Sequence, residues 1–284
     1  MTQSKKMKKK AILPNILTAL SLLCGLFVIF KANMVPPGEV TYLQVLVGTI
    51  ILLVAAILDV LDGAIARALK AESEFGINFD SLSDAVVFGV APAVLILKTL
   101  SMTPGTLVSF CVMTGAMVYS ISGVLRLVRF NVSTQQVPDD TEQKAIAMKH
   151  FTGLPITAAA ACVTSMSLLL LSADFQSFVP VTEETRAYIA AAVFVMIGFF
   201  MVSRWKFPSV KALRFRVGSF QLVFLTTVVA AALLVGMLHH FPLVFAGCIW
   251  SYFIVAIVLS MARIIAGKRL QALEDFEPES EDEE

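Results

Sequence analysis

Long apolar stretches separated by short polar connections are the feature that most constrains how this chain can fold. Seven stretches contain no charged residue, and an eighth carries only Asp80 and Asp84. Each is close to the roughly 20 residues that a helix needs to cross a bilayer. The stretches are 11–30, 40–58, 77–97, 99–125, 151–173, 187–203, 217–238 and 241–262.

A water-soluble domain of this length cannot bury so much apolar surface. The 284 residues are 57% hydrophobic and 15% charged, and the mean hydropathy is +0.82. In lipid, every backbone polar group must pair inside the protein, and a helix achieves this within one segment. The sequence therefore predicts an all-α fold, a polytopic membrane helical bundle of about eight transmembrane helices.

The basic residues predict the orientation of this bundle. When the spans alternate in direction, only Lys31, Lys98 and Arg186 of the 22 Lys and Arg fall on the side opposite to the others. Cytoplasmic connections carry the excess of Lys and Arg in membrane proteins. We therefore expect an integral protein of the cytoplasmic (inner) membrane, with both termini and the Asp80 segment facing the cytoplasm.

The polar ends divide the chain into three parts. Residues 1–10 predict a basic cytoplasmic arm, 11–266 one membrane domain, and 267–284 an acidic cytoplasmic tail that is disordered by composition. The four cysteines form no CxxC pair, which argues against a thiol metal site. No nucleic-acid motif occurs, so no nucleic-acid partner is expected.

Four aspartates at helical spacing are the main functional signal. Asp59 and Asp62 are three residues apart near the end of one span, and Asp80 and Asp84 are four apart near the start of the next. Residues three or four apart lie on one face of a helix. A short turn near 70–75 joins the two helices, so the two acidic faces are expected to meet.

Clustered carboxylates repel one another unless they take up protons or bind cations. Ligands that are all oxygen favour hard ions such as Mg²⁺ or Mn²⁺. Four aspartates are enough for two such ions, an arrangement that clamps a phosphoryl group during displacement. We therefore expect Asp59, Asp62, Asp80 and Asp84 to bind two metal ions, with Asp84, the deepest, also taking a proton from an incoming hydroxyl.

The residues between the aspartates suit a substrate that carries phosphate. Gly63 and Gly76 lack Cβ and allow a bulky group to approach the backbone. Arg67, one turn beyond Gly63, can donate to a diphosphate. Ser73 places a hydroxyl in the connecting turn.

Each of these residues also has a simpler explanation. A glycine in a membrane helix often serves packing, an arginine near a helix end often extends to the interface, and membrane aspartates also form proton relays. A cation or proton-coupled transporter with an Asp site is the alternative outside the enzymes. The one-sided placement of the aspartates and the lack of matching acids on later spans argue against it.

The pattern Asp-x-x-Asp-Gly-x-x-Ala-Arg, eight residues, Gly-x-x-x-Asp-x-x-x-Asp resembles the signature of the CDP-alcohol phosphotransferase family. The matching positions are Asp59, Asp62, Gly63, Ala66, Arg67, Gly76, Asp80 and Asp84. The resemblance implies a membrane enzyme with a six-helix core and a two-metal site open to the cytoplasm. Such enzymes transfer a phosphatidyl or related group from a CDP-linked donor to an alcohol and release CMP.

The resemblance also implies individual roles. Asp59 and Asp62 would bind metal, Asp80 would bridge both ions, and Asp84 would bind metal and act as the base. Gly63, Arg67 and Ser73 would contact the donor. Members of the family are often homodimers, so a homodimer is expected here.

Further segments resemble the membrane-embedded phosphatidylserine synthase branch of this family. They are Pro14-Asn15-Ile-Leu-Thr18, Arg126-Leu-Val-Arg129-Phe130-Asn131, Phe151-Thr-Gly153-Leu154-Pro155, Val202-Ser203-Arg204 and Pro208-Ser209. This implies CDP-diacylglycerol and L-serine as substrates. Thr157 and Trp205-Lys206 depart from the usual pattern, which leaves a sibling enzyme using glycerol 3-phosphate or another alcohol as the alternative.

A serine acceptor would require donors for its carboxylate. Arg126, Arg129 and Arg204, with Asn131 as an amide partner, are the candidates, and positive-inside topology is the competing explanation for the arginines. Asn15 either contacts the nucleotide or caps a helix.

Overall fold

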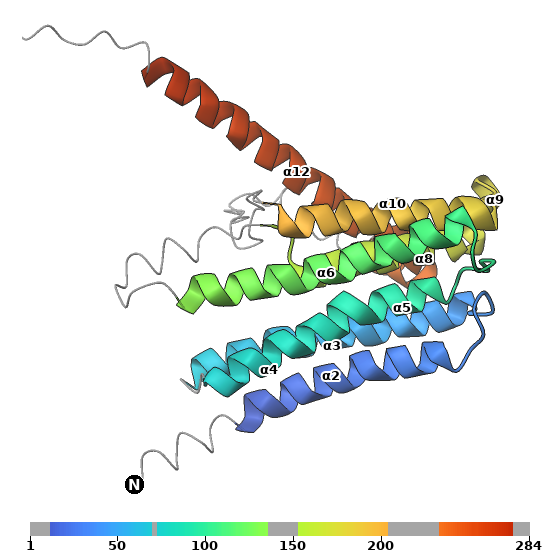
Figure 1. The fold of residues 1–284 in the computed structure, drawn as a ribbon, viewed down its shortest axis with the longest axis horizontal. Coiled ribbons are helices and arrows are strands. Elements are labelled where there is room, and N and C mark those ends of the chain that lie inside the picture. The colour runs from blue at the N-terminus through green and yellow to red at the C-terminus, as the bar shows by residue number, and fades with distance from the viewer. Residues whose placement is uncertain (1–11, 70–72, 136–152, 204–232, 275–284) are drawn as a thin grey trace, which may run out of the picture.

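The computed structural model describes residues 12–69, 73–135, 153–203 and 233–274, and these ranges contain helices and no strand. Figure 1 shows the arrangement. The elements are α2 (Ile12–Asn33), α3 (Tyr42–Ala68), α4 (Glu74–Asp84), the π-helix η1 (Ala85–Val90), α5 (Ala91–Leu97), α6 (Leu107–Gln135), α8 (Ile156–Leu171), α9 (Ala173–Phe178), α10 (Glu183–Val202) and α12 (Phe241–Glu274).

Within the described part of the chain, six helices are long and apolar enough to cross a membrane. They are Ile12–Asn33, Tyr42–Ala68, Glu74–Leu97, Leu107–Val132, Glu183–Val202 and Phe241–Met261. The helix Ile156–Leu171 is apolar but shorter, and most of the predicted span 217–238 lies outside the described residues. The all-helical membrane fold is confirmed, and the count of eight stays a prediction.

The outer surface of the bundle is strongly apolar. Large side chains such as Leu23 (62% exposed), Phe110 (69%) and Phe199 (62%) point away from the core. A surface of this kind is stable against lipid and not against water. Together with the lengths of the helices, it makes this an integral membrane protein.

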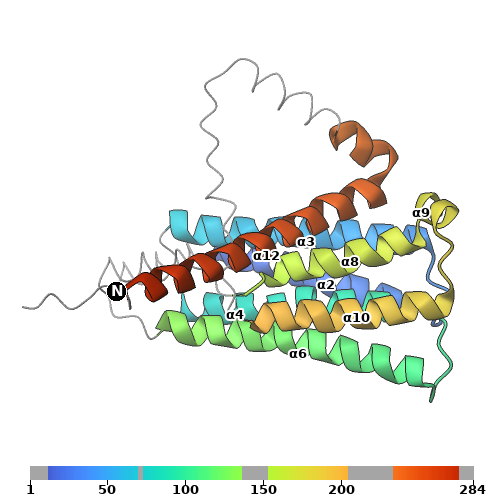
Figure 2. The ribbon, with the colours of Figure 1, turned by 90° about the horizontal axis from the view of Figure 1, so that it is seen from above.

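The helices form a bundle in which neighbours run along one another. Figures 1 and 2 show α2, α3, α6, α8 and α10 roughly aligned, whereas α12 crosses obliquely. The most extensive contacts join α6 with α10 and α2 with α3, and α12 packs on α8. Small residues allow the helices to approach closely, as where Gly115 on α6 faces Ala191 on α10.

Hydrogen bonds identify which helix ends lie together. At one end, Asn131 on α6 donates to Ser81 on α4 (2.8 Å), and Arg129 donates to the carbonyl of Val202 at the end of α10 (2.9 Å). At the other end, His240, just before α12, lies 2.8 Å from Asp174 on α9. The first end carries the predicted site.

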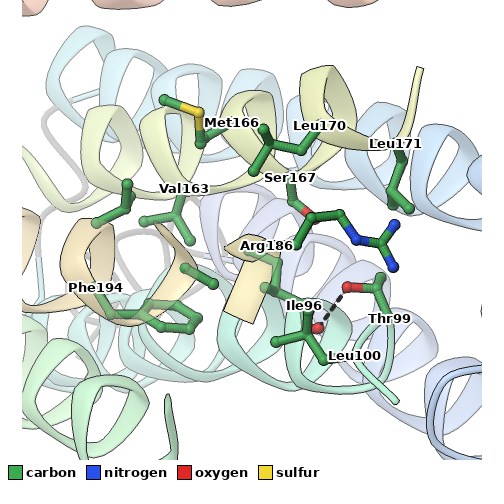
Figure 3. Close-up of a pocket in the computed structure, with 12 residues that line it drawn as sticks. Ile96, Thr99, Leu100, Val163, Met166, Ser167, Leu170, Leu171, Arg186 and Phe194 are labelled. Carbon is green, nitrogen blue, oxygen red and sulfur yellow. Dashed lines mark hydrogen bonds between the residues drawn. The ribbon is translucent and has the colours of Figure 1, made fainter. Parts of the chain in front are cut away.

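A small cavity lies near the second end, between α5, α8 and α10 (Figure 3). Apolar side chains dominate its lining, and the guanidinium of Arg186 extends into it and pairs with Glu183. Its volume is about 20 Å³, enough for about one water molecule. The cavity is therefore too small for a nucleotide or a lipid.

The predicted polar ends lie partly outside the described residues. The arm 1–10 and residues 275–284 are not described. α12 continues to Glu274, into the segment 267–284 that the sequence assigns to the tail, and the division of the chain into arm, membrane domain and tail stays a prediction. The sequence Lys268-Arg-Leu-Gln-Ala-Leu-Glu274 consists of good helix formers, and extending an existing helix requires no new nucleation.

Candidate active site

The four aspartates of the motif come together between α3 and α4. One carboxylate oxygen from each of Asp59, Asp62 and Asp80 lies within 4.8 Å of the others. The carboxyl group of Asp59 is within hydrogen-bonding reach of those of Asp80 and Asp84. Asp62 is buried and the other three are half-buried. The cluster therefore lies partly inside the bundle, at this end of it.

The local sequence explains how α3 and α4 reach this geometry. α3 ends at Ala68, and α4 begins after the N-cap Ser73, whose hydroxyl accepts a 3.0 Å hydrogen bond from the N–H of Gly76. Such a cap fixes the first turn of a helix. The hydroxyl predicted to contact the donor is therefore used to start the helix that carries Asp80.

Helix α2 supports the cluster from the side. The hydroxyl of Thr18 donates to Oδ2 of Asp62 over 2.6 Å. The hydroxyl of Ser83 on α4 donates to the carbonyl of Thr18 over 3.4 Å. Sequence reasoning assigned no such role to Thr18, although a threonine in an apolar span four residues after Pro14 was a signal to examine.

The cluster fits a divalent metal centre. Oδ1 of Asp80 is buried and has no hydrogen-bond partner among the described residues. A buried carboxylate oxygen without a partner is costly. A hard cation held by Asp59, Asp62 and Asp80 would satisfy that oxygen and offset the repulsion among the carboxylates.

The two glycines of the motif have different neighbours. A Cβ at Gly63 would lie 3.4 Å from a guanidinium nitrogen of Arg67, so this side chain folds back over Gly63. A Cβ at Gly76 would lie 3.1 Å from Oγ of Ser73 and 3.2 Å from Oδ1 of Asn15. The structure thus places Asn15 of α2 beside the first turn of α4.

The candidate acceptor residues on α6 differ in their partners. Arg129 donates to the carbonyl of Val202, and Asn131 donates to Ser81. Arg126 is half-buried, interacts electrostatically with Asp84, and its Nε has no partner among the described groups. Arg126 is therefore the best placed of the three to meet an anionic group near Asp84. Arg204 lies outside the described residues.

The π-helix that follows Asp84 was not predicted. Its carbonyls at Phe88 and Gly89 accept hydrogen bonds from Tyr119 (2.6 Å) and Ser120 (2.7 Å) on α6. Pro92, one turn after Phe88, was the signal in the sequence for a disturbed helix, because proline removes a helical N–H donor. π-Helices are rare and frequently occur at functional sites.

Comparison with known proteins agrees with this geometry. The sequence model of the CDP-alcohol phosphatidyltransferase family matches residues 11–198, a range that includes all four aspartates. A CDP-diacylglycerol–serine O-phosphatidyltransferase of Helicobacter pylori is 31% identical over 263 residues, which cover 92% of this chain and 97% of that protein.

Two other relatives match over shorter lengths. The protein of the same name from Mycobacterium leprae is 39% identical over 175 residues, 61% of this chain, and the match spans about half (51%) of that protein. An archaetidylserine synthase of Methanothermobacter thermautotrophicus is 36% identical over 169 residues, 57% of this chain and 58% of that protein. Because the family model spans most of the membrane domain and its acidic motif, this chain belongs to the CDP-alcohol phosphatidyltransferase family.

Proposed function

We propose that this protein transfers a phosphatidyl group from CDP-diacylglycerol to the hydroxyl of L-serine, forming phosphatidylserine and CMP. The observation that carries the proposal is the convergence of Asp59, Asp62 and Asp80 within 4.8 Å, with Asp84 beside them. The names of the relatives from Helicobacter pylori and Mycobacterium leprae support serine as the alcohol.

The reaction is a displacement at phosphorus. The serine oxygen forms a bond to the phosphorus that bears the diacylglycerol group, and the bond from this phosphorus to the CMP oxygen breaks. Asp84 takes the proton of the serine hydroxyl as the new bond forms. CMP leaves with the electron pair of the broken bond, and the acyl chains remain in the bilayer throughout.

Asp59, Asp62, Asp80 and Asp84 would hold two divalent ions, Mg²⁺ or Mn²⁺, with Asp80 shared between them. Bound there, the ions supply positive charge that stabilises the diphosphate and the departing CMP. Thr18 keeps the carboxylate of Asp62 oriented through its 2.6 Å hydrogen bond. Side chains that hydrogen-bond to a metal ligand tune both the geometry of the metal site and its affinity for the ion.

The donor would lie along the first turn of α4. Arg67 donates to its diphosphate, and Gly63 lets the nucleotide approach the backbone of α3. Gly76 and Asn15 form the adjoining wall, since a Cβ at Gly76 would come within 3.2 Å of the Asn15 amide oxygen. Ser73 contributes by capping the helix.

The acceptor would bind between Asp84 and α6. Arg126 offers its unpartnered Nε to the serine carboxylate, while Arg129 and Asn131 hold the ends of α10 and α4 near it. An arginine fork matches the planar geometry of a carboxylate.

The membrane placement completes the proposal. Arg67, Arg126 and Arg129 belong to the end of the bundle that carries the aspartates, which supports a site facing the cytoplasm from the cytoplasmic membrane. The homodimer implied by the family resemblance is part of the proposal as well.

Acceptor-dependent CMP release tests this function. Purified protein in detergent would be incubated with CDP-diacylglycerol, Mn²⁺ or Mg²⁺, and either L-serine or glycerol 3-phosphate. We expect release with L-serine that stops on addition of EDTA. Release with glycerol 3-phosphate alone would overturn the acceptor and retain the reaction class, and no release with any alcohol would favour a cation transporter.

A further inference from the structure

The helix that carries Asp80 and Asp84 changes its hydrogen-bond pattern immediately after Asp84. Pro92 has no backbone N–H, so the carbonyl of Phe88, four residues earlier, loses its α-helical donor. Ala85–Val90 forms a π-helix, in which the N–H of Ala91 donates to the carbonyl of Val86 five residues earlier. The carbonyl of Phe88 consequently has no α-helical donor.

Two neighbouring side chains of α6 donate to carbonyls of this segment. The hydroxyl of Tyr119 donates to the carbonyl of Phe88 over 2.6 Å, and that of Ser120 donates to the carbonyl of Gly89 over 2.7 Å. Tyr119 is fully buried. Successive side chains leave a helix about 100° apart, so the two hydroxyls together restrain both rotation and sliding of α6 against η1.

The backbones also approach closely at this junction. A Cβ on Gly123, one turn after Tyr119, would lie 3.7 Å from the Cα of Gly89. The backbones of α6 and the π-helix are therefore near each other at this point, and the side chain of Ile156 on α8 packs beside them, with its Cδ1 3.0 Å from the same Cβ position. Small shifts of α6 along η1 would break both hydrogen bonds.

Two groups of the candidate site lie beyond one end of this junction. Arg126 follows Tyr119 by two helical turns on the same face, about 10 Å further along the axis. Asp84 precedes Phe88 by one turn, and α6 runs antiparallel to α4 and α5 (Figure 1). Both residues therefore lie on the same side of the junction, where Arg126 and Asp84 interact electrostatically.

We propose that Tyr119 and Ser120 are positioning residues, which attach α6 to the carbonyls of the π-helix and thereby hold Arg126 at the distance from Asp84 that the acceptor requires. This role rests on the proposed function, which assigns Arg126 to the serine carboxylate and Asp84 to the serine hydroxyl. In the proposed function the donor would lie along α3 and the first turn of α4, so the attachment would govern use of the alcohol far more than use of CDP-diacylglycerol.

A simpler role for the two hydroxyls would be to satisfy these buried backbone carbonyls and nothing else. Pro92→Ala distinguishes the two roles, because it restores a backbone N–H that can reach the carbonyl of Phe88. In a Tyr119→Phe background, this change satisfies the carbonyl without attaching α6 to it. Satisfaction of the carbonyl and attachment of the helix are thus separated.

The experiment compares Tyr119→Phe, Pro92→Ala and the double variant with wild-type protein, using Tyr188→Phe on α10 as the matched control. Thermal stability in detergent and separate KM values for L-serine and CDP-diacylglycerol are measured. For Tyr119→Phe we expect a lower Tm, a KM for serine raised about tenfold, and a KM for CDP-diacylglycerol within about twofold of wild type. The double variant should regain Tm and keep the raised serine KM.

An unchanged serine KM in Tyr119→Phe, or full recovery of it in the double variant, would overturn the positioning role. If Tyr119→Phe does not purify as a folded protein, Ser120→Ala carries the same expectation of a raised serine KM, and an unchanged serine KM in that variant would overturn the positioning role. Wild-type protein that is inactive with every alcohol contradicts the proposed function, whereas active wild-type protein with an unaffected Tyr119→Phe contradicts only this inference.

Discussion

The hydroxyl of Thr18 in α2 donates a 2.6 Å hydrogen bond to Oδ2 of Asp62 in α3, 44 residues away in the chain. Both residues are buried, at 5% and 3% exposure. One oxygen of Asp62 is thus oriented by a neutral donor. Because this bond joins two helices, it fixes part of the aspartate cluster before any substrate binds.

Replacing Thr18 with valine removes this donor and keeps the shape of the side chain. We expect the apparent affinity for Mn²⁺ or Mg²⁺ to fall by about 10- to 100-fold, as is common when a partner of a metal ligand is lost. A metal titration of CMP release measures this, and excess metal should restore most of the activity. Thr18→Ser, which retains the hydroxyl, is the control, and a metal dependence of Thr18→Val equal to that of wild type would remove this role.

Asp84→Asn should abolish transfer while the protein still inserts and assembles. The amide keeps the size of the side chain and cannot take a proton from the alcohol, so a loss of at least about 1000-fold in kcat is expected. CMP release and size-exclusion profile are measured together. Asp174→Asn, at the opposite end of the bundle, is the matched control, and normal turnover of Asp84→Asn would exclude Asp84 from the mechanism.

Gly76→Ala should impair use of the donor. Its Cβ would lie 3.1 Å from Oγ of Ser73 and 3.2 Å from Oδ1 of Asn15. Both distances are shorter than ordinary van der Waals contact, so the added methyl group would crowd the wall that we propose for the nucleotide site. We expect the KM for CDP-diacylglycerol to rise by about tenfold and the serine KM to change little. Gly247→Ala on α12, where a Cβ meets nothing within 4 Å, should behave as wild type.

A KM for CDP-diacylglycerol that stays at the wild-type value in Gly76→Ala would contradict a role of Gly76 beside the donor. Asn15→Ala added to Gly76→Ala provides a further check. Removing the amide relieves the contact at 3.2 Å, so the double variant should recover part of the lost affinity if crowding is the cause.

Arg126→Gln should raise the KM for L-serine by about 10- to 100-fold, because an uncharged amide replaces a charge-assisted donor. Arg126→Lys should give an intermediate value, since it keeps the charge and loses the planar fork. The KM for CDP-diacylglycerol serves as the internal reference. Equal increases in both KM values would show that Arg126 does not act selectively on the alcohol.

The aspartate cluster could be predicted from sequence because it depends on local periodicity. Asp59 with Asp62, and Asp80 with Asp84, lie three or four residues apart, and helical geometry places each pair on one face. The short connection after Ala68 then brings the faces together. Apolar length likewise predicted the membrane helices, since the bilayer fixes how long they must be.

The supporting contacts depend on distant pairs that periodicity does not specify. Thr18 reaches Asp62 across 44 residues, and Tyr119 reaches the carbonyl of Phe88 across 31. Pro92 indicated a disturbed helix but not which side chain would satisfy the free carbonyl. Similarly, the sequence offered Arg126, Arg129 and Arg204, with Asn131 as an amide partner, without ranking the arginines. Tertiary contacts separate Arg126 from Arg129 and Asn131, which hold other helices.

The most direct test of the central claim follows the serine oxygen into the product. Wild-type protein, CDP-diacylglycerol and Mn²⁺ would be incubated with L-serine labelled with ¹⁸O in its hydroxyl, and both products analysed by mass spectrometry. Attack of the hydroxyl on phosphorus predicts phosphatidylserine that retains ¹⁸O and CMP that carries none. Label in CMP, or no serine-containing lipid at all, would contradict the account.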